Sequence, residues 1–308
     1  MEKVIKVIEE SFLAPLLSDK NITDISYNGH KLFYFSNESG RKLYGEINHK
    51  TVASFLRNVA NFANERFSYA DTFLDISIGK YRLSAMHYAC SRFEFKESLS
   101  FALRINHNFL ASNPHYLNND VVDVLKYVMK ENRSIIISGT TGVGKTTLQK
   151  YLLMLLPANT RVLVIDNVLE LSEVTTLNKD LDLTLWQSLT NKEEEIKSFI
   201  QKALRFHPDY LIIAESRGGE MKEILQGAIS GHPNIVTLHA DSTALAYERV
   251  IYLAKHDDRH SLLQAFPFVI HLAKKYKADG SIYRYVEKIT EYNVDTDEIE
   301  ILYHEVIP

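Results

Sequence analysis

The sequence is poor in cysteine and contains no long uncharged apolar segment. Cys90 is the single cysteine among 308 residues, which excludes an internal disulfide and a multi-cysteine zinc site. No segment approaches the roughly 20 consecutive apolar residues that a membrane-spanning helix needs. The first residues, MEKVIKVIEESFLAPLL, lack an uncharged apolar core followed by a small-residue cleavage site, so we expect no export signal. These absences predict a protein of the reducing cytoplasm.

The sequence also lacks an excess of positive charge. Its 35 lysines and arginines and 39 aspartates and glutamates leave a formal net charge of -4. Such a chain has no general attraction for phosphate backbones, so we expect no direct binding of nucleic acid. Hydrophobic residues make up 45% of the chain, which is enough for two cores in domains of roughly 100 to 200 residues each. We therefore expect two domains.

Residues 1–112 show the pattern of a small α+β domain. Three strand-like runs over residues 22–47, separated by turn residues, predict an antiparallel sheet. Apolar side chains over residues 52–63 recur at helical spacing, which predicts a helix packed on that sheet. Strand patterns resume over residues 73–105. The polar, proline-containing segment 113–120 predicts a linker to the next domain.

Residues 121–308 show a different texture, in which apolar strands alternate with helical segments. This alternation predicts an α/β domain with a mostly parallel sheet covered by helices. After residue 265 the pattern returns to period-two strands, with a hairpin turn expected at residues 278–281. The other expected elements are a helix over 121–129, strands over 134–139, 161–166 and 209–215, a helix after the glycine-rich loop and a helix around 196–204.

A glycine-rich loop follows the first of these strands. Gly139 to Thr146 fit the pattern G-x-x-x-x-G-K-[ST], known as Walker A, between an apolar strand and a helical run. Backbone N–H groups of such a loop wrap phosphates, the lysine reaches the β- and γ-phosphates, and the hydroxyl binds Mg²⁺. We therefore expect ATP and Mg²⁺ to bind here. The predicted contacts are Gly139, Thr140, Thr141, Gly142, Val143, Gly144, Lys145, Thr146 and Thr147.

Acidic residues end two further apolar strands. Glu215 follows the strand DYLIIA and is the candidate general base that activates the attacking water, although a solvated acid at a strand end is also common. Asp166 follows the strand RVLVI, and Glu170 lies four residues later. Acids at these two positions suit either Mg²⁺ or the attacking water. The expected Mg²⁺ ligands are Thr146 and Glu170, with Asp166 as a further candidate.

Two longer segments resemble one family of motors. The runs ALRFHPDYLIIAESRGGE and SGHPNIVTLHAD resemble the hexameric secretion ATPases, which serve type II secretion, type IV pili and type IV secretion. The resemblance implies a RecA-like C-terminal domain in which Glu215 is the Walker B glutamate and Arg217 is the first residue of the family's RGGE-like turn. It also implies that His232 and His239 form a histidine box, in which His232 contacts the nucleotide and His239 takes part in catalysis.

The resemblance extends to weaker segments. IDNVLEL resembles the aspartate box of the family, with Glu170 as its last acid, but Asp166 and Asn167 stand where the family usually has Glu and Asp. GKYRLSA and SFALRIN resemble N-terminal elements whose arginines, here Arg82 and Arg104, approach the nucleotide. The sequence patterns and the resemblance together predict six catalytic residues: Glu215, Glu170, Arg217, Arg82, Arg104 and His239.

The resemblance further implies an ATP-driven homo-hexameric ring at the cytoplasmic face of the inner membrane. Its partners would be secretion-channel or pilus-assembly proteins of that membrane, with peripheral association to the membrane itself. The short chain and its single cysteine, which excludes a four-cysteine zinc element, favour the type IV secretion and conjugation branch. The alternatives are a motor of a type IV pilus or of type II secretion, a nucleic-acid translocase, and a nucleotide-binding scaffold with little catalysis.

Overall fold

The computed structural model divides the chain into two compact units. The first comprises Met1–Asn108 with Tyr276–Tyr283, and the second comprises Phe109–Lys275 with Arg284–Pro308. Part of the predicted linker 113–120 lies outside the described residues, and the predicted domain boundaries stay a prediction. The structure describes residues 2–106, 116–166, 169–188, 193–216, 218–255, 258–278 and 281–305.

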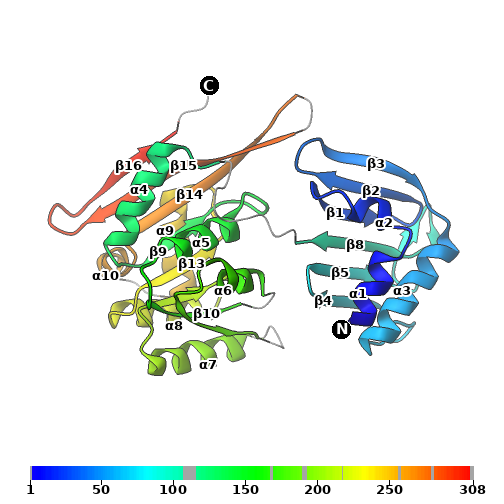
Figure 1. Cartoon of the computed structure of the whole chain (residues 1–308), viewed down its shortest axis with the longest axis horizontal. Coiled ribbons are helices and arrows are strands. Elements are labelled where there is room, and N and C mark those ends of the chain that lie inside the picture. The colour runs from blue at the N-terminus through cyan, green and yellow to red at the C-terminus, as the bar shows by residue number, and fades with distance from the viewer. Residues whose placement is uncertain are drawn as a thin grey trace. The chain divides into compact units, whose positions relative to one another are not determined.

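The first unit is built on an antiparallel sheet (Figure 1). Six of the described strands form it in the order β3-β2-β1-β8-β5-β4, so that the predicted strands over residues 22–47 and 73–105 join one sheet. The strands are β1 (Ile22–Tyr27), β2 (Lys31–Ser36), β3 (Gly40–Glu46), β4 (Phe73–Ile78), β5 (Tyr81–Met86) and β8 (Ser100–Ile105), beside the short pair β6 (Arg92–Phe93) and β7 (Lys96–Glu97).

Helices cover one face of this sheet. They are α1 (Glu2–Glu9), α2 (Ala14–Leu17) and α3 (His49–Ala63). The α3 helix confirms the predicted helical stripe: the Asn48 side chain accepts a hydrogen bond from the Lys50 N–H at its start, and Asn64 ends it in a left-handed conformation. Because side chains alternate along a strand, the opposite face of the sheet carries the polar residues. Arg82 and Arg104 lie on that face.

The second unit contains a larger, mostly parallel sheet (Figure 1). Its described strands follow the order β11-β10-β12-β13-β9-β14-β15-β16, and those from β11 to β14 pair in parallel. The predicted hairpin turn before β15 lies partly outside the described residues. The strands are β9 (Ile135–Ser138), β10 (Arg161–Ile165), β11 (Asp182–Trp186), β12 (Tyr210–Ile213), β13 (Asn234–Leu238), β14 (Phe268–Tyr276), β15 (Ile282–Asn293) and β16 (Glu298–His304).

Helices cover both faces of this sheet. Successive residues of β9 separate the two layers: Ile135 and Ile137 pack with α4 and α5, whereas Ile136 packs with α7 to α10. The helices are α4 (Asn119–Lys130), α5 (Lys145–Met154), α6 (Val174–Leu177), α7 (Glu193–Ala203), α8 (Met221–Ile229), α9 (Thr243–Ala254) and α10 (Arg259–Ala265), with the 3₁₀ turns η1 (Glu170–Glu173) and η2 (Leu204–Phe206). The predicted α/β class is confirmed.

None of the helices in the described ranges is both long and apolar enough to cross a bilayer.

One strand escaped the sequence analysis. The edge strand β11 ends at Trp186, the single tryptophan of the chain. Its indole meets the rings of Phe199 and Phe206 edge-on, with centroids 5.7 and 5.1 Å away. These contacts attach β11 to the helical layer that contains α7.

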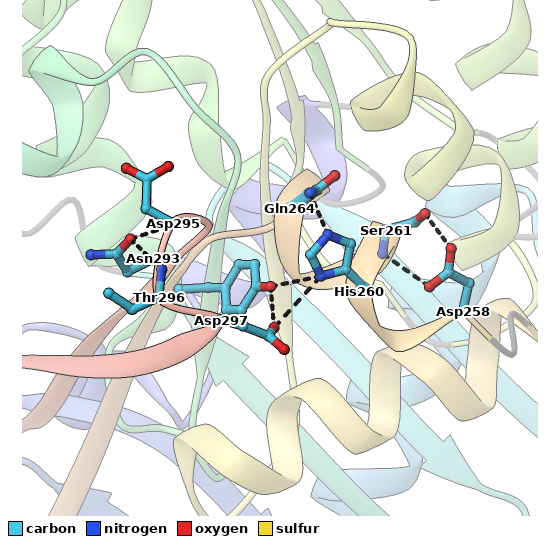
Figure 2. A network of polar contacts seen from close by, with 9 residues as sticks. Asp258, His260, Ser261, Gln264, Asn293, Asp295, Thr296 and Asp297 are labelled. Carbon is cyan, nitrogen blue, oxygen red and sulfur yellow. Dashed lines mark hydrogen bonds and ion pairs between the residues drawn. The ribbon is translucent and has the colours of Figure 1, made fainter.

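A polar cluster joins α10 to the turn between β15 and β16 (Figure 2). His260 Nδ1 lies 2.8 Å from the Tyr292 hydroxyl, which donates to Asp297 at 2.5 Å. At the start of α10, the Asp258 carboxylate accepts a hydrogen bond from the Ser261 N–H. The α10 helix precedes β14 and therefore lies at the amino edge of the parallel strands. These contacts hold the last strands in place, at the edge away from the glycine-rich loop.

Candidate nucleotide-binding and catalytic site

The parallel strands bring the predicted site residues to one edge of the sheet. Leu238 of β13 and His271 of β14 both pair with Ser138, the last residue of β9. Ile213 of β12 pairs with Ile165 of β10. The loops after these strands therefore start side by side, at the carboxyl edge where α/β sheets bind ligands.

The backbone geometry of the loop explains why glycine stands at positions 139 and 144. Gly139 has φ of 143°, and an added Cβ would lie 2.3 Å from the Leu272 carbonyl oxygen of β14. Gly144 has φ of 102° and caps the start of α5. Its carbonyl accepts a hydrogen bond of 3.0 Å from the Tyr116 hydroxyl. A side chain at position 139 or 144 would force the backbone to move.

Lys145 turns back over the loop from the first position of α5. Its ammonium donates to the Gly139 carbonyl at 2.8 Å and to the Thr140 carbonyl at 3.0 Å. Burial lowers the pKa of Lys145 to about 8; the Glu215 carboxylate opposes this shift and the Lys274 ammonium adds to it. A buried ammonium with a depressed pKa gains more from an arriving phosphate than an exposed lysine does.

Glu215 is held at the end of β12 by the neighbouring strand. The Thr237 hydroxyl donates to the Ala214 carbonyl at 2.6 Å, and the Ser216 N–H donates to the Thr237 carbonyl at 3.0 Å. The residues before and after Glu215 are thus both fixed to β13. This fixes the point from which its carboxylate leaves the backbone.

His239 connects the glutamate to the lysine. Its Nδ1 lies 3.4 Å from the Lys145 ammonium, and its Nε2 lies 3.5 Å from the Glu215 carboxylate. An ammonium can only donate, so Nδ1 accepts and a neutral imidazole carries its proton on Nε2, facing Glu215. Sequence positions 145, 215 and 239 therefore meet in one polar connection.

The segment after β10 is fixed by buried polar contacts. Asp166 is 1% exposed and accepts a hydrogen bond of 2.9 Å from the Leu171 N–H. Lys150 of α5 forms a buried ion pair of 2.7 Å with Glu173. These contacts hold η1, which begins at Glu170, against the helix of the glycine-rich loop. The burial of Asp166 favours a structural role for it over Mg²⁺ binding. Asn167, which differs from the residue usual in the family, lies outside the described residues.

A nucleotide-bound Mg²⁺ fits this donor set. Within the described ranges, no group of three or more His, Cys, Asp or Glu side chains could hold a metal ion by itself. Mg²⁺ that arrives with a nucleotide takes only one or two protein ligands, because phosphates and waters supply the others. The Thr146 hydroxyl and the Glu170 carboxylate are hard oxygen donors, and neither residue is buried.

His232 is not brought to this edge. It precedes β13, where the Asn234 N–H donates to the Ser134 hydroxyl at 3.0 Å. Pro233 and the five residues of β13 separate His232 from His239, and the strand alone spans roughly 16 Å. The structure therefore places His232 at the opposite edge from the glycine-rich loop of its own chain.

The predicted RGGE turn is described only in part, because Arg217 lies outside the described residues. Glu220 is buried and accepts hydrogen bonds from the Ser216 hydroxyl at 3.0 Å and the Gly218 N–H at 3.3 Å. The last acid of this turn is thus bound to Ser216 and Gly218.

Arg82 and Arg104 lie together in the first unit. They are direct cross-strand partners on β5 and β8. Arg82 lies 3.6 Å from Asp75, and Arg104 lies 3.1 Å from Asp24. The structure therefore places the two arginines side by side, and their approach to a nucleotide stays a prediction.

Two residues at the loop were missed by the sequence analysis. Lys274 of β14 donates to the Thr141 carbonyl, and Arg284 of β15 donates to the Gly142 carbonyl, each at 2.8 Å. They lie more than 130 positions from the loop, and no local pattern marks them. Only the order of strands in the sheet could have indicated them.

A buried polar chain supports the strand below the loop and was also missed. The Ser138 hydroxyl lies 2.9 Å from His271 Nδ1, and His271 Nε2 lies 3.4 Å from Glu287. Burial lowers the pKa of His271, although Glu287 opposes this shift. A neutral His271 thus links β9, β14 and β15 beneath the site.

A glycine-rich loop between a buried strand and a helix, with a lysine turned back over it, defines a P-loop α/β domain. The match to the family "Type II/IV secretion system protein" covers residues 101–290. The chain belongs to this family.

Two relatives show how far the similarity extends along the chain. An uncharacterised Bacillus anthracis protein is 28% identical over 316 residues, which cover 95% of this chain and 70% of that protein. The type IV secretion system protein VirB11 of Bartonella quintana is 30% identical over 170 residues, which cover 54% of this chain and 46% of that protein. The match thus spans less than half the length of this VirB11.

The fold is shared with a solved ATPase. The Yersinia pseudotuberculosis ATPase DotB superposes with a TM-score of 0.70 at 14% identity, over 95% of this chain and 79% of that chain. The likeness confirms the predicted fold, an α+β domain followed by a RecA-like domain.

Proposed function

We propose that this chain is an ATP-hydrolysing motor of a type IV secretion or conjugation machine. One observation carries the enzymatic part of the proposal: His239 lies between the Lys145 ammonium and the Glu215 carboxylate, at 3.4 and 3.5 Å. A phosphate-binding cation at the start of α5 and a candidate base after β12 therefore share one site.

Binding rests on the Walker A loop. The N–H groups of the loop and the amino end of α5 attract the phosphates. Lys145 would neutralise the β- and γ-phosphates, which replaces the carbonyl contacts it makes with Gly139 and Thr140. Mg²⁺, held with the nucleotide by the Thr146 hydroxyl and Glu170, would offset further phosphate charge.

Hydrolysis rests on Glu215. Its carboxylate would orient a water molecule and accept its proton as the water oxygen bonds to the γ-phosphorus. The bond from the γ-phosphorus to the bridging oxygen breaks, and ADP and phosphate are the products. The Nε2 proton of His239 faces Glu215 and would hold the carboxylate in place. Arg82, Arg104 and Arg217 remain the predicted cations for the transition-state charge.

The system-level proposal follows from the family and its relatives. We propose a homo-hexameric ring at the cytoplasmic face of the inner membrane, docked on secretion-channel proteins. The similarity to VirB11 supports the type IV secretion branch, and a type IV pilus or type II secretion motor stays the alternative. The net charge of -4 counts against direct binding of nucleic acid. Sedimentation of the full chain with and without nucleotide tests the ring.

Phosphate release separates an enzyme from a nucleotide-binding scaffold. We expect Glu215→Gln to lower kcat by about 10² to 10³-fold while ATP still binds. Glu248→Gln, which changes an exposed acid on α9, should leave kcat unchanged. Equal and near-zero release by the wild type and Glu215→Gln would defeat the enzyme assignment.

The binding assignment has its own test. Lys145→Ala should abolish ATP binding in equilibrium dialysis, because the loop loses the cation that meets the phosphates. Retained affinity would contradict the Walker A assignment. In cells, Glu215→Gln should stop secretion or conjugative transfer, whereas an effect on pilus retraction alone would favour the pilus motor.

A further inference from the structure

The outer side of the glycine-rich loop is held by two cations from the C-terminal strands. The Lys274 ammonium donates to the Thr141 carbonyl at 2.8 Å, and the Arg284 guanidinium donates through Nε to the Gly142 carbonyl at 2.8 Å. Both contacts reach the apex of the loop, where its backbone is least constrained by β9 and α5.

These two cations continue a row of hydrogen bonds from cationic side chains to the carbonyls of the loop. Lys145 already occupies the carbonyls of Gly139 and Thr140. Together with the contacts of Lys274 and Arg284, four consecutive carbonyls of the loop accept hydrogen bonds from three cationic side chains. Hydrogen bonds with a charged donor are roughly twice as strong as neutral ones.

The sheet explains how distant residues reach this loop. Strand β14 pairs in parallel with β9 up to His271 and continues to Tyr276, so its last residues lie beside the loop. Strand β15 is the next strand in the sheet. The Lys274 side chain lies close enough to the loop that a Cβ added to Gly142 would be 3.8 Å from its ammonium.

Peptide geometry gives these contacts a consequence. In a trans peptide the C=O of one residue and the N–H of the next point in opposite directions. A cation on the Thr141 carbonyl therefore directs the Gly142 N–H to the other side of the loop, and one on the Gly142 carbonyl does the same for the Val143 N–H. Without these contacts, the glycine-rich apex could rotate its peptide planes.

We propose that Lys274 and Arg284 are positioning residues of the nucleotide site, which hold the N–H groups of Gly142 and Val143 toward the phosphates. This inference rests on the proposed function, because it assumes that a nucleoside triphosphate occupies the loop. The two residues act through the backbone, so they set the affinity for phosphates more than the rate of the chemical step.

The test compares variants of the full chain by the Kd for ADP and by the KM and kcat for ATP. Lys274→Met and Arg284→Met keep the apolar stems but remove the donors. Each should weaken ADP binding about tenfold, with kcat changed less than about threefold. Lys275→Met removes the same charge from the next position of β14, on the opposite face, and should leave the Kd unchanged.

Rescue distinguishes positioning from a purely structural role. Lys274→Arg retains a donor and should restore the Kd to within about threefold of the wild type. The nucleotide-free melting temperature of the Met variants should stay within about 3 °C of the wild type. A variant that does not fold is replaced by Lys274→Arg combined with Arg284→Met, which keeps one contact.

The proposal and the proposed function fail in different ways. An unchanged Kd in Lys274→Met combined with Arg284→Met, while Lys145→Ala loses binding, would overturn the positioning role alone. A loss of kcat at unchanged KM would also overturn it. Retained binding in Lys145→Ala would instead overturn the assignment of the site itself.

Discussion

Arg104 in the first unit and Lys150 in the second each pair with a carboxylate, but in opposite surroundings. The Arg104 and Asp24 side chains are 55% and 41% exposed, whereas those of Lys150 and Glu173 are 6% and 14% exposed. Water screens the first pair and is excluded from the second. The same chemistry is therefore available for new contacts in one unit and fixed as a structural support in the other.

The two sheets explain this difference. An antiparallel sheet with helices on one side carries its polar residues on the other side, and Arg82 and Arg104 lie there as direct neighbours. A parallel sheet with helices on both sides is closed on its faces and gathers polar residues at its carboxyl edge. The antiparallel sheet therefore carries charged side chains across one face, whereas the parallel sheet gathers them around Lys145 and Glu215.

Removal of the buried cation should give the largest effect on stability. Lys150→Met leaves the Glu173 carboxylate buried beside an apolar chain, which should cost about 3 to 5 kcal/mol of unfolding free energy. Urea unfolding followed by circular dichroism measures this loss. The double variant Lys150→Met with Glu173→Leu should recover most of it, since no unpaired charge remains. A single-variant cost below about 1 kcal/mol would remove the contrast with the exposed pair.

Two glycines offer the next comparison. Gly139 and Gly45 both have positive φ, 143° and 155°, but an added Cβ meets the Leu272 carbonyl at position 139 and nothing within 4 Å at position 45. Ala at either position carries the backbone cost of about 1 to 3 kcal/mol. Gly139→Ala should cost about 1 to 3 kcal/mol more, because the backbone must move. Equal losses of unfolding free energy in the two variants, measured with urea, would show that β14 moves away from the added Cβ without an energetic cost.

The pKa of Lys145 predicts a pH dependence of binding. Its pKa of about 8 lies below the ordinary lysine value, so the free protein loses the Lys145 proton above pH 8. Phosphate binds the protonated form, and the Kd for ATP should therefore rise up to about tenfold per pH unit above pH 8. Calorimetry in two buffers should detect proton uptake on binding at pH 9. A Kd that is flat from pH 7 to pH 9 would contradict this prediction.

The same shift affects folding with the opposite trend. Between pH 8 and the ordinary lysine value, the unfolded chain binds more protons at Lys145 than the folded chain does. The contribution of Lys145 to unfolding free energy therefore increases as the pH rises through this window. Binding weakens while this contribution grows.

The smallest effect on stability is expected at the exposed pair. Arg104→Met should change the unfolding free energy by at most about 1 kcal/mol. If Arg104 meets the nucleotide as predicted, kcat for ATP should nevertheless fall at least about tenfold. Arg41→Met, on the edge strand β3 of the same sheet, serves as the control. A large loss of stability with unchanged kcat would reverse the roles assigned to the two units.

Local patterns carried most of the fold. The helix α3 and the strands β9, β10 and β12 were predicted because apolar periodicity and flanking turn residues agree within short windows. The loop from Gly139 to Thr146 was predicted because its chemistry requires contiguous residues. Glu215 was predicted as an acid at the end of an apolar strand and His239 from the resemblance, and the structure brings both to Lys145.

The features that the sequence did not predict correctly have physical causes. Strand β11 is short and half-polar, and its packing depends on Trp186 meeting rings from α7 and η2. Lys274 and Arg284 reach the loop through strand order, which no local window contains. His232 shares a motif with His239, but a strand of five residues carries the two to opposite ends.

Trp186 gives the second unit an internal optical probe. It is the single tryptophan of the chain, so all indole emission comes from one place. Its carbonyl accepts a hydrogen bond from the Asp166 N–H, and its ring touches Phe199. A shift in emission wavelength would therefore report, without any added label, when the outermost strand separates from the segment that precedes Glu170.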